Sequence, residues 1–87
     1  MIEMNPVSVR VLRYIVDQIR ERDAIPTRTK VAKLLYLVDV EYYRRHGRTL
    51  TELAWRFLHY GPYAVEIEPL LQSFDLEEEN EIAELRR

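Results

Sequence analysis

The sequence predicts a small, mostly α-helical protein: two long helices packed against each other, a short extended segment or strand near residues 53–60, and one or two C-terminal helices. Two stretches, one ending near residue 22 and the other near residue 46, carry apolar side chains at the three- and four-residue spacing of amphipathic helices. Prolines and glycines fall at the ends of these stretches and not inside them. A chain of 87 residues suffices for one small core, so we assign residues 1–87 to a single domain.

The first helix is expected to begin at Pro6 and to end at about Arg22. Asn5 suits the N-cap, and proline is tolerated at the first helical position because its missing N–H is not needed there. Pro26 lies in the break after the helix, since proline lacks a donor and disfavours helical geometry in the residue before it. The expected core-facing residues are Leu12, Ile15, Val16 and Ile19, with Arg10, Arg13, Asp17 and Arg20 mostly opposite.

The second helix is expected to run to about His46. Thr27 or Thr29 can cap its start, and Gly47 suits the left-handed position just after its end. Leu37 and Val40 interrupt the helical pattern, because both fall on the otherwise polar side. The expected core stripe consists of Val31, Leu35, Val38 and Tyr42.

The last third of the chain is less regular. Residues 49–51 read as a loop, and the aromatic content of residues 53–60 favours an extended segment, although a short helix stays open. Gly61 and Pro62 predict a turn, and a third helix with Pro69 in its first turn should follow. Asp75 and Glu78 have capping-box spacing, which predicts a last helix over residues 76–87. The remaining expected core residues are Leu53, Trp55, Phe57, Ile67, Leu70, Leu71 and Phe74.

Composition narrows the classes of function. The chain has no cysteine, which excludes disulfides, thiolate metal sites and a cysteine nucleophile. Its start lacks the pattern of a signal peptide and no apolar run is long enough to span a membrane, so we expect a cytoplasmic protein without membrane contact. The net charge of −2 argues against a dedicated nucleic-acid binder.

A polar stripe at helical spacing is the nearest approach to a catalytic site: Tyr36, Asp39, Tyr43 and His46. A carboxylate near an imidazole could perform acid–base chemistry, but nothing in the sequence marks a substrate pocket. The alternative is that Asp39 accepts hydrogen bonds from tyrosine or arginine and attaches the second helix to residues 55–60, as buried polar groups are normally paired. We favour this structural role and expect no catalytic residues.

No motif indicates a bound cofactor or metal. His46 and His59 lack the helical pairing and neighbouring ligands of known zinc motifs, and two glycines are too few for a phosphate-binding loop. We therefore predict neither a cofactor nor a metal.

The sequence indicates a surface for protein interaction more clearly than a catalytic or metal site. Arginines gather at the end of the second helix, where the helix dipole favours positive charge, and arginine also pairs well with carboxylates on a partner. Exposed Leu37 and Val40 beside tyrosines fit the composition of protein interfaces, although single exposed apolar residues are also ordinary. The residues predicted to contact a partner are Tyr36, Leu37, Val40, Tyr43, Arg44, Arg48, His59, Tyr60 and Tyr63.

A series of short motifs supports this interpretation: Lys33-Leu34-Leu35-Tyr36-Leu37, Asp39, Tyr42, Arg45-His46-Gly47-Arg48, Leu50-Thr51 and Tyr60-Gly61-Pro62. In this order and at these separations, over about residues 30–74, the sequence resembles the Panacea domain family, the SocA-like and GepA-like antitoxins and prophage-associated proteins of mobile elements. The resemblance implies a mostly helical domain that binds and neutralises a toxin protein, or an adaptor that delivers one to a protease. It implies no catalytic residues. Contact with a protease or chaperone and homo-oligomerisation are compatible with it.

The end of the chain departs from the family pattern. Family domains generally continue beyond the third helix, whereas this sequence ends in a short acidic stretch, residues 76–87. It is therefore either a minimal or truncated member, or another copy or partner supplies the remaining elements.

Two other functions stay open. The first is a small DNA-binding transcriptional regulator with a helix-turn-helix-like unit, in which basic side chains contact phosphates. Its phosphate contacts would be Arg28, Lys30, Lys33, Arg44 and Arg45. The second is an enzyme that uses Asp39 and His46, which requires a concave pocket over both residues.

Overall fold

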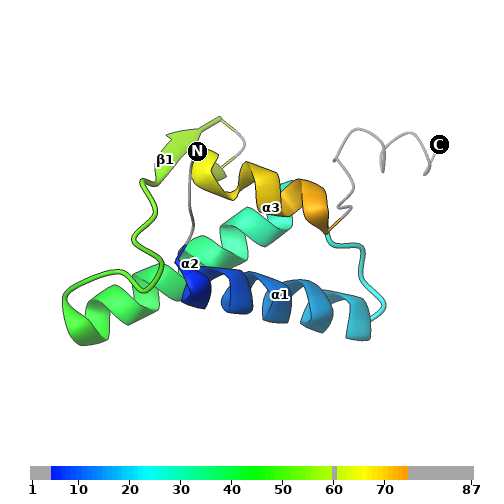
Figure 1. The fold of residues 1–87 in the computed structure, drawn as a ribbon, viewed down its shortest axis with the longest axis horizontal. Helices are drawn as coiled ribbons and strands as arrows, with labels where there is room; N and C mark the ends of the chain where they lie inside the picture. Colours follow the sequence, from blue (N-terminus) through cyan, green and yellow to red (C-terminus); the bar gives the residue numbers. More distant parts are fainter. Residues whose placement is uncertain (1–4, 60, 75–87) are drawn as a thin grey trace.

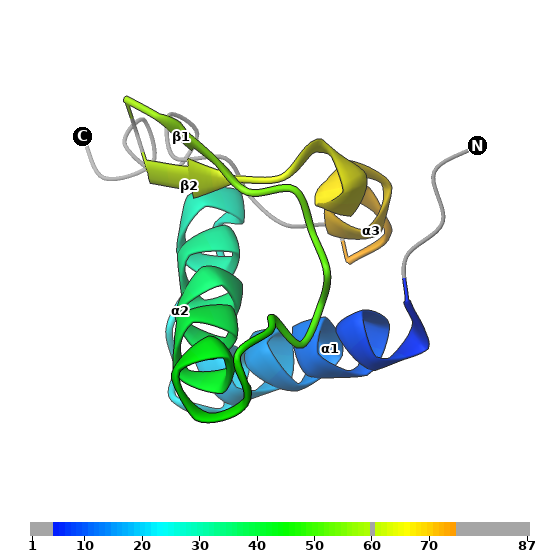
Figure 2. The same cartoon turned by 90° about the vertical axis from the view of Figure 1, so that its left-hand side faces the viewer.

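The computed structural model describes residues 5–59 and 61–74, and it confirms the mostly α-helical fold class. Two long helices, α1 and α2, are followed by a β-hairpin of strands β1 and β2 and by a short helix, α3 (Figure 1). α2 runs back across α1, and the hairpin and α3 lie on one side of this helix pair (Figure 2). The predicted capping box at Asp75 and the predicted helix over residues 76–87 lie outside the described residues.

Helix α1 spans Pro6–Glu21, close to the predicted bounds. The Oδ1 atom of Asn5 accepts a hydrogen bond from the backbone N–H of Val7 at 2.8 Å, so the predicted N-cap is confirmed. The four predicted core-facing residues are buried, and the four polar residues predicted opposite them are exposed.

Helix α2 spans Arg28–His46, and its cap is Thr27, one of the two threonines that the sequence allowed. The Oγ1 atom of Thr27 accepts from the backbone N–H of Lys30 at 3.1 Å. Gly47 ends the helix in the left-handed conformation, with φ of 74°, as predicted. Both ends of the longest helix are therefore defined by local chemistry.

Replacing Gly47 by alanine is expected to lower the free energy of unfolding by about 1 kcal/mol, because a Cβ atom disfavours positive φ. No atom lies within 4 Å of the position that this Cβ would take, so the loss comes from the backbone alone. Urea denaturation followed by circular dichroism measures the change. Gly47→Asn should recover part of the loss, because asparagine tolerates this conformation better than alanine; an asparagine variant no more stable than the alanine variant would contradict this explanation.

Strands β1 (Arg56–Leu58) and β2 (Gly61–Tyr63) form an antiparallel hairpin in which Phe57 pairs with Pro62 and Leu58 with Gly61. The predicted extended segment is confirmed in part. The turn predicted at Gly61 and Pro62 is wrong, because both residues belong to β2 and the chain reverses before them. Gly61 has φ of 126°, which favours glycine. Pro62 occupies the middle of β2, which pairs with β1 alone among the described residues, and its missing N–H is tolerated in such a strand.

A short 3-10 helix, Val65–Ile67, leads directly into α3, Glu68–Ser73. Pro69 lies in the first turn of α3, as the sequence required. Ile67 and Leu71 are fully buried and close the core over the α1–α2 pair.

The core agrees largely with the prediction, and two residues require correction. Phe57 was expected inside but is 67% exposed, since β1 presents all three of its side chains to solvent. Tyr42 is only half-buried. Small or polar residues that the apolar pattern did not indicate are buried instead, namely Ser8, Thr27, Ala32, Asp39, Thr51 and Ala64. The predicted core residues that pack against the buried cluster while partly exposed are Val38, Leu53, Trp55, Leu70 and Phe74.

Candidate functional site

The carboxylate of Asp39 is the centre of a buried polar network. It is 1% exposed, and its Oδ1 atom accepts from the backbone N–H groups of Leu50 and Thr51, each at 3.0 Å. Its Oδ2 atom accepts from the hydroxyl of Thr51 and from Nε1 of Trp55, the latter at 2.8 Å. The predicted structural role of Asp39 is confirmed, because it ties α2 to the chain that leads into the hairpin.

The donors to Asp39 differ from those predicted. They are backbone groups, a threonine and a tryptophan, not tyrosine or arginine. Thr51 extends the network to α1, since its carbonyl oxygen accepts from the hydroxyl of buried Ser8 at 3.4 Å. One indication of the role of Thr51 was present in the sequence, because Leu50-Thr51 is among the motifs that carry the family resemblance.

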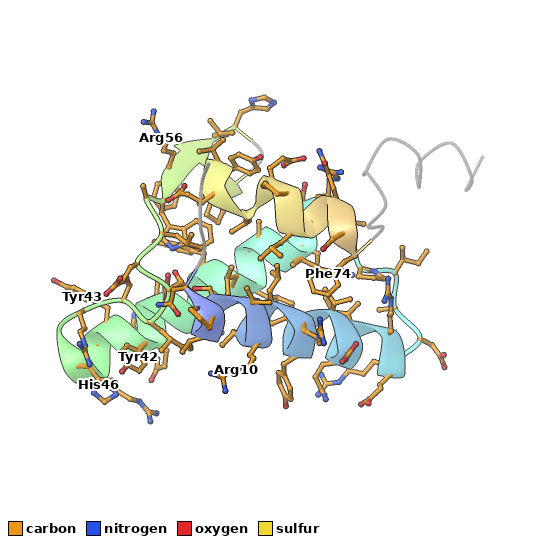
Figure 3. The ribbon with its side chains drawn as sticks, viewed as in Figure 1. Arg10, Tyr42, Tyr43, His46, Arg56 and Phe74 are labelled. Atoms are coloured by element: carbon orange, nitrogen blue, oxygen red, sulfur yellow. The ribbon has the colours of Figure 1, made fainter. Side chains whose placement is uncertain are left out.

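The acid–base arrangement considered from the sequence does not form. Both oxygens of Asp39 are occupied by structural donors, whereas His46 is exposed and its ring packs on that of Tyr42, with centroids 4.1 Å apart. Figure 3 places Tyr42 and His46 on one side of α2 and Tyr43 on the side of the hairpin. In residues 5–59 and 61–74, no three His, Asp or Glu side chains group closely enough to hold a metal ion.

Aromatic side chains connect α2 to the hairpin. The ring of Tyr36 meets those of Trp55 and Phe57 edge-on, with centroid distances of 5.4 and 5.2 Å. Offset or edge-to-face pairs of this kind add about 0.5–1.5 kcal/mol beyond the area that they bury. Tyr36 therefore packs against one side of Phe57, while most of the Phe57 side chain stays exposed to solvent.

Several of the predicted partner-contacting residues continue this aromatic group along α2. Val40 and Tyr43 follow Tyr36 at four and seven residues, which places them on the same side of a helix. Tyr43 is 57% exposed, and Arg44 and Arg48 are exposed at the C-terminal end. We call Tyr36, Val40, Tyr43, Arg44, Arg48 and Phe57 the α2–hairpin surface. Phe57 is its member that sequence reasoning missed, because its hydrophobicity placed it in the predicted core.

The other predicted contact residues have different environments. Leu37 is 49% exposed but lies in a groove between α1 and α2, away from Tyr43. His59 is exposed at the end of the hairpin, and Tyr60 lies outside the described residues. Tyr63 is half-buried, and its hydroxyl donates to the carboxylate of Glu68.

Glu68 joins three elements. Besides the hydroxyl of Tyr63 from β2, its carboxylate pairs with the guanidinium of Arg28 at the start of α2. The hydrogen bond from Tyr63 lowers the pKa of Glu68 most, burial acts in the opposite direction, and Arg28 lowers the pKa further. Arg28, one of the phosphate contacts of the DNA-binding alternative, is thus engaged inside the protein.

Because the pKa of Glu68 is lowered on folding, its ionised form stabilises the fold above the ordinary glutamate value of about 4.3. This contribution should be lost as the pH falls below that value and passes through the pKa of the folded state. Urea denaturation at pH 7 and at pH 3 should show Glu68→Gln to be less stable than the natural protein at pH 7, with a smaller difference at pH 3. Glu52→Gln, at an exposed glutamate, serves as the control; an equal Glu68→Gln deficit at both pH values would contradict the assignment.

Comparison with known proteins identifies a family for most of the chain. The family model described as "Antitoxin SocA-like, Panacea domain" matches residues 31–86, which include all but the first three residues of α2, the hairpin and α3. No curated protein and no solved structure matches the chain. Among the described residues, no helix has the length and apolar character needed to cross a membrane.

Proposed function

Because this chain belongs to the SocA-like Panacea antitoxin family, we propose that it is an antitoxin-type protein that binds and neutralises a protein toxin through the α2–hairpin surface. The observation that carries the proposal is the exposure of Tyr43 and Phe57 on one side of the molecule, joined by half-buried Tyr36 and Val40. Exposed aromatic residues flanked by arginine have the composition of interface hot spots.

The surface is preformed. Asp39 fixes the chain that enters the hairpin, and Tyr36 supports Phe57, so these aromatic rings need little ordering when a partner binds. Arg44 and Arg45 form exposed ion pairs with Glu41, at 3.9 and 3.1 Å. Such pairs contribute little to stability, so a carboxylate on the partner can replace Glu41 at low cost. We infer that the toxin presents an apolar or aromatic centre with acidic residues at its border.

The other parts of the proposal follow from the family. The protein acts in a toxin–antitoxin or prophage-derived system in the cytoplasm, and it works by binding without catalysis. Delivery of the toxin to a protease is the adaptor form of the same function, and it requires a second surface.

The test is capture of a partner by the tagged full chain from its native lysate, with nuclease treatment and mass spectrometry. The captured protein is then expressed alone and together with the chain. We expect a protein whose expression arrests growth and whose toxicity is relieved by the chain. Arg44→Ala should weaken capture, whereas Arg10→Ala, at an exposed arginine on α1, should not. Retention of nucleic acid alone, lost on nuclease treatment, would replace the proposal by the DNA-binding function.

A further inference from the structure

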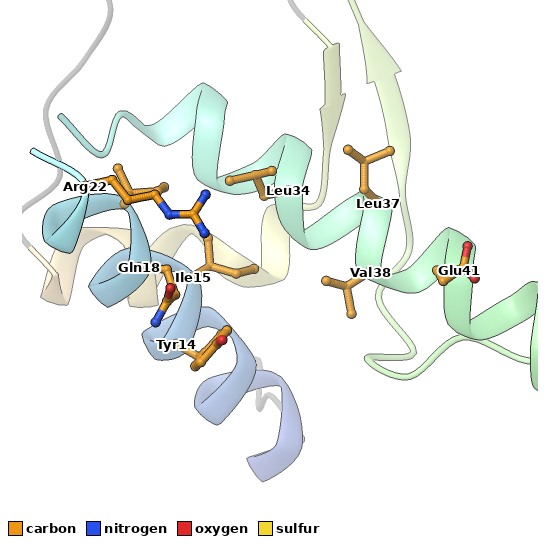
Figure 4. A pocket seen from close by; sticks show the side chains of 9 residues that line it. Tyr14, Ile15, Gln18, Arg22, Leu34, Leu37, Val38 and Glu41 are labelled. Atoms are coloured by element: carbon orange, nitrogen blue, oxygen red, sulfur yellow. The ribbon is translucent and has the colours of Figure 1, made fainter. Parts of the chain in front are cut away.

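A groove lies between α1 and α2, outside the α2–hairpin surface. It has a volume of about 470 Å³, and its floor and walls are mostly apolar, formed by Tyr14, Ile15, Ile19, Leu34, Leu37 and Val38 (Figure 4). Tyr14 is 64% exposed, and Leu34 and Leu37 are also exposed. Three large apolar side chains beside one groove form a patch of the kind that a protein segment usually covers.

One charged side chain stands at each end of the groove. Arg22 stands at one end, and its guanidinium makes no hydrogen bond or ion pair with any residue that the structure describes. Glu41 stands at the other end, but its charge is already compensated by Arg44 and Arg45. An apolar floor with an arginine at one end that has no charged partner among the described residues suits an amphipathic segment that is rich in acidic residues.

The chain itself contains such a segment. Residues 75–87 carry six acidic and two basic side chains, whereas the rest of the chain carries nine acidic and eleven basic ones. Ile82 and Leu85 are three residues apart and would lie on one side of the helix predicted from this sequence. Acidic residues surround them, so the segment has the two properties that the groove requires.

Phe74 lies close enough to the groove for the segment that follows it to reach the groove. The carbonyl oxygen of Phe74 accepts from Nη2 of Arg20 at 3.1 Å, so the described chain ends beside the C-terminal end of α1, two residues from Arg22. Half the circumference of a helix of about 10–12 Å diameter is about 16–19 Å, which takes roughly five or six extended residues at about 3.3 Å each. The remaining seven or eight residues, which include Ile82 and Leu85, would span about 11–12 Å as a helix that begins later than the predicted residue 76. The groove from Arg22 to Tyr14 is about 12 Å long at the same rise per residue.

We propose that residues 75–87 dock into the α1–α2 groove, with Ile82 and Leu85 on its apolar floor and acidic side chains toward Arg22. The segment then completes the domain by covering Tyr14, Leu34 and Leu37. The family match extends to residue 86, which agrees with a segment that forms part of the domain. This inference does not depend on the α2–hairpin surface being the site of toxin binding.

Disulfide trapping in the full chain tests the proposal, because the natural sequence has no cysteine. One variant carries Gln18→Cys on the groove wall and Arg86→Cys, which lies one helical turn after Ile82 and beside the two apolar anchors. The control variant carries Val65→Cys, exposed and outside the groove, with the same Arg86→Cys. Under mild oxidation, we expect the first pair to close within one chain at least about ten times faster than the control pair, because docking raises the effective concentration. Adding Ile82→Asp and Leu85→Asp should abolish this difference.

Circular dichroism establishes that each variant is folded, and Glu41→Cys with Arg86→Cys replaces the first pair if Gln18→Cys disturbs α1. Equal rates in the groove and control pairs, or rates unchanged by the two aspartate substitutions, would overturn the proposal. Disulfides that form only between two chains would overturn it in favour of a second copy as the occupant.

Discussion

Replacing Asp39 by alanine is expected to lower the free energy of unfolding by about 3–5 kcal/mol and the melting temperature by roughly 15–30 °C. The substitution removes the acceptor of four hydrogen bonds, given by two backbone N–H groups, one hydroxyl and one indole N–H. Donors left unpaired inside a protein cost about 1–3 kcal/mol each, and water entering the space that the carboxylate leaves would recover part of the loss. The total stability of a domain of this size is only about 4–13 kcal/mol, so a large share of it depends on one side chain.

Urea denaturation, followed by circular dichroism and by the fluorescence of Trp55, measures this effect. Asp17→Ala is the matched control, since Asp17 is an exposed aspartate on α1, and it should change stability by less than about 0.5 kcal/mol. Asp39→Asn keeps the shape but replaces one acceptor oxygen by an N–H₂ donor facing other donors, so it should also destabilise strongly. A loss below about 1 kcal/mol for Asp39→Ala would mean that the network contributes little to holding the loop to α2.

The bounds of the two long helices could be predicted because local chemistry determines them. Asn5, Thr27 and Gly47 each act within four residues of their own position in the sequence. The hairpin could not be placed in the same way. Gly61 and Pro62 are typical of turns, and their place in β2 depends on pairing with Leu58 and Phe57.

The environment of Asp39 and Phe57 could also be predicted from the sequence only in part. The buried role of Asp39 could be predicted, because a carboxylate on the core side of a helix needs donors. Its partners could not, since Leu50, Thr51 and Trp55 reach it through a loop in which Glu52 adopts a positive φ of 60°. Phe57 was placed in the core on its hydrophobicity alone, and only the three-dimensional arrangement shows that the described elements leave it exposed.

The exposure of Phe57 leads to the second large expected effect. Replacing Tyr43 and Phe57 together by alanine should weaken binding of the toxin about 100-fold, if each ring contributes about 1.4 kcal/mol, a modest value for an aromatic hot spot. The fold should change little, because both side chains are largely in solvent and the lost edge-on contact of Phe57 with Tyr36 contributes only about 0.5–1.5 kcal/mol. Titration calorimetry with the purified toxin gives the dissociation constant, and thermal melting gives the stability.

A tyrosine control, Tyr14→Ala, distinguishes binding at the α2–hairpin surface from binding at the α1–α2 groove. Tyr14 is as exposed as Tyr43 but lies on the α1–α2 groove, so Tyr14→Ala should leave toxin affinity within about three-fold of the natural value, which is below 1 kcal/mol. If Tyr14→Ala weakens binding while the Tyr43 and Phe57 variant does not, the toxin occupies the groove, and the proposed surface on α2 and the hairpin is wrong. If the double variant alone loses affinity, the exposed rings of Tyr43 and Phe57 contact the toxin. Their exposure then has a functional reason, because a monomer gains nothing from keeping Phe57 out of its core.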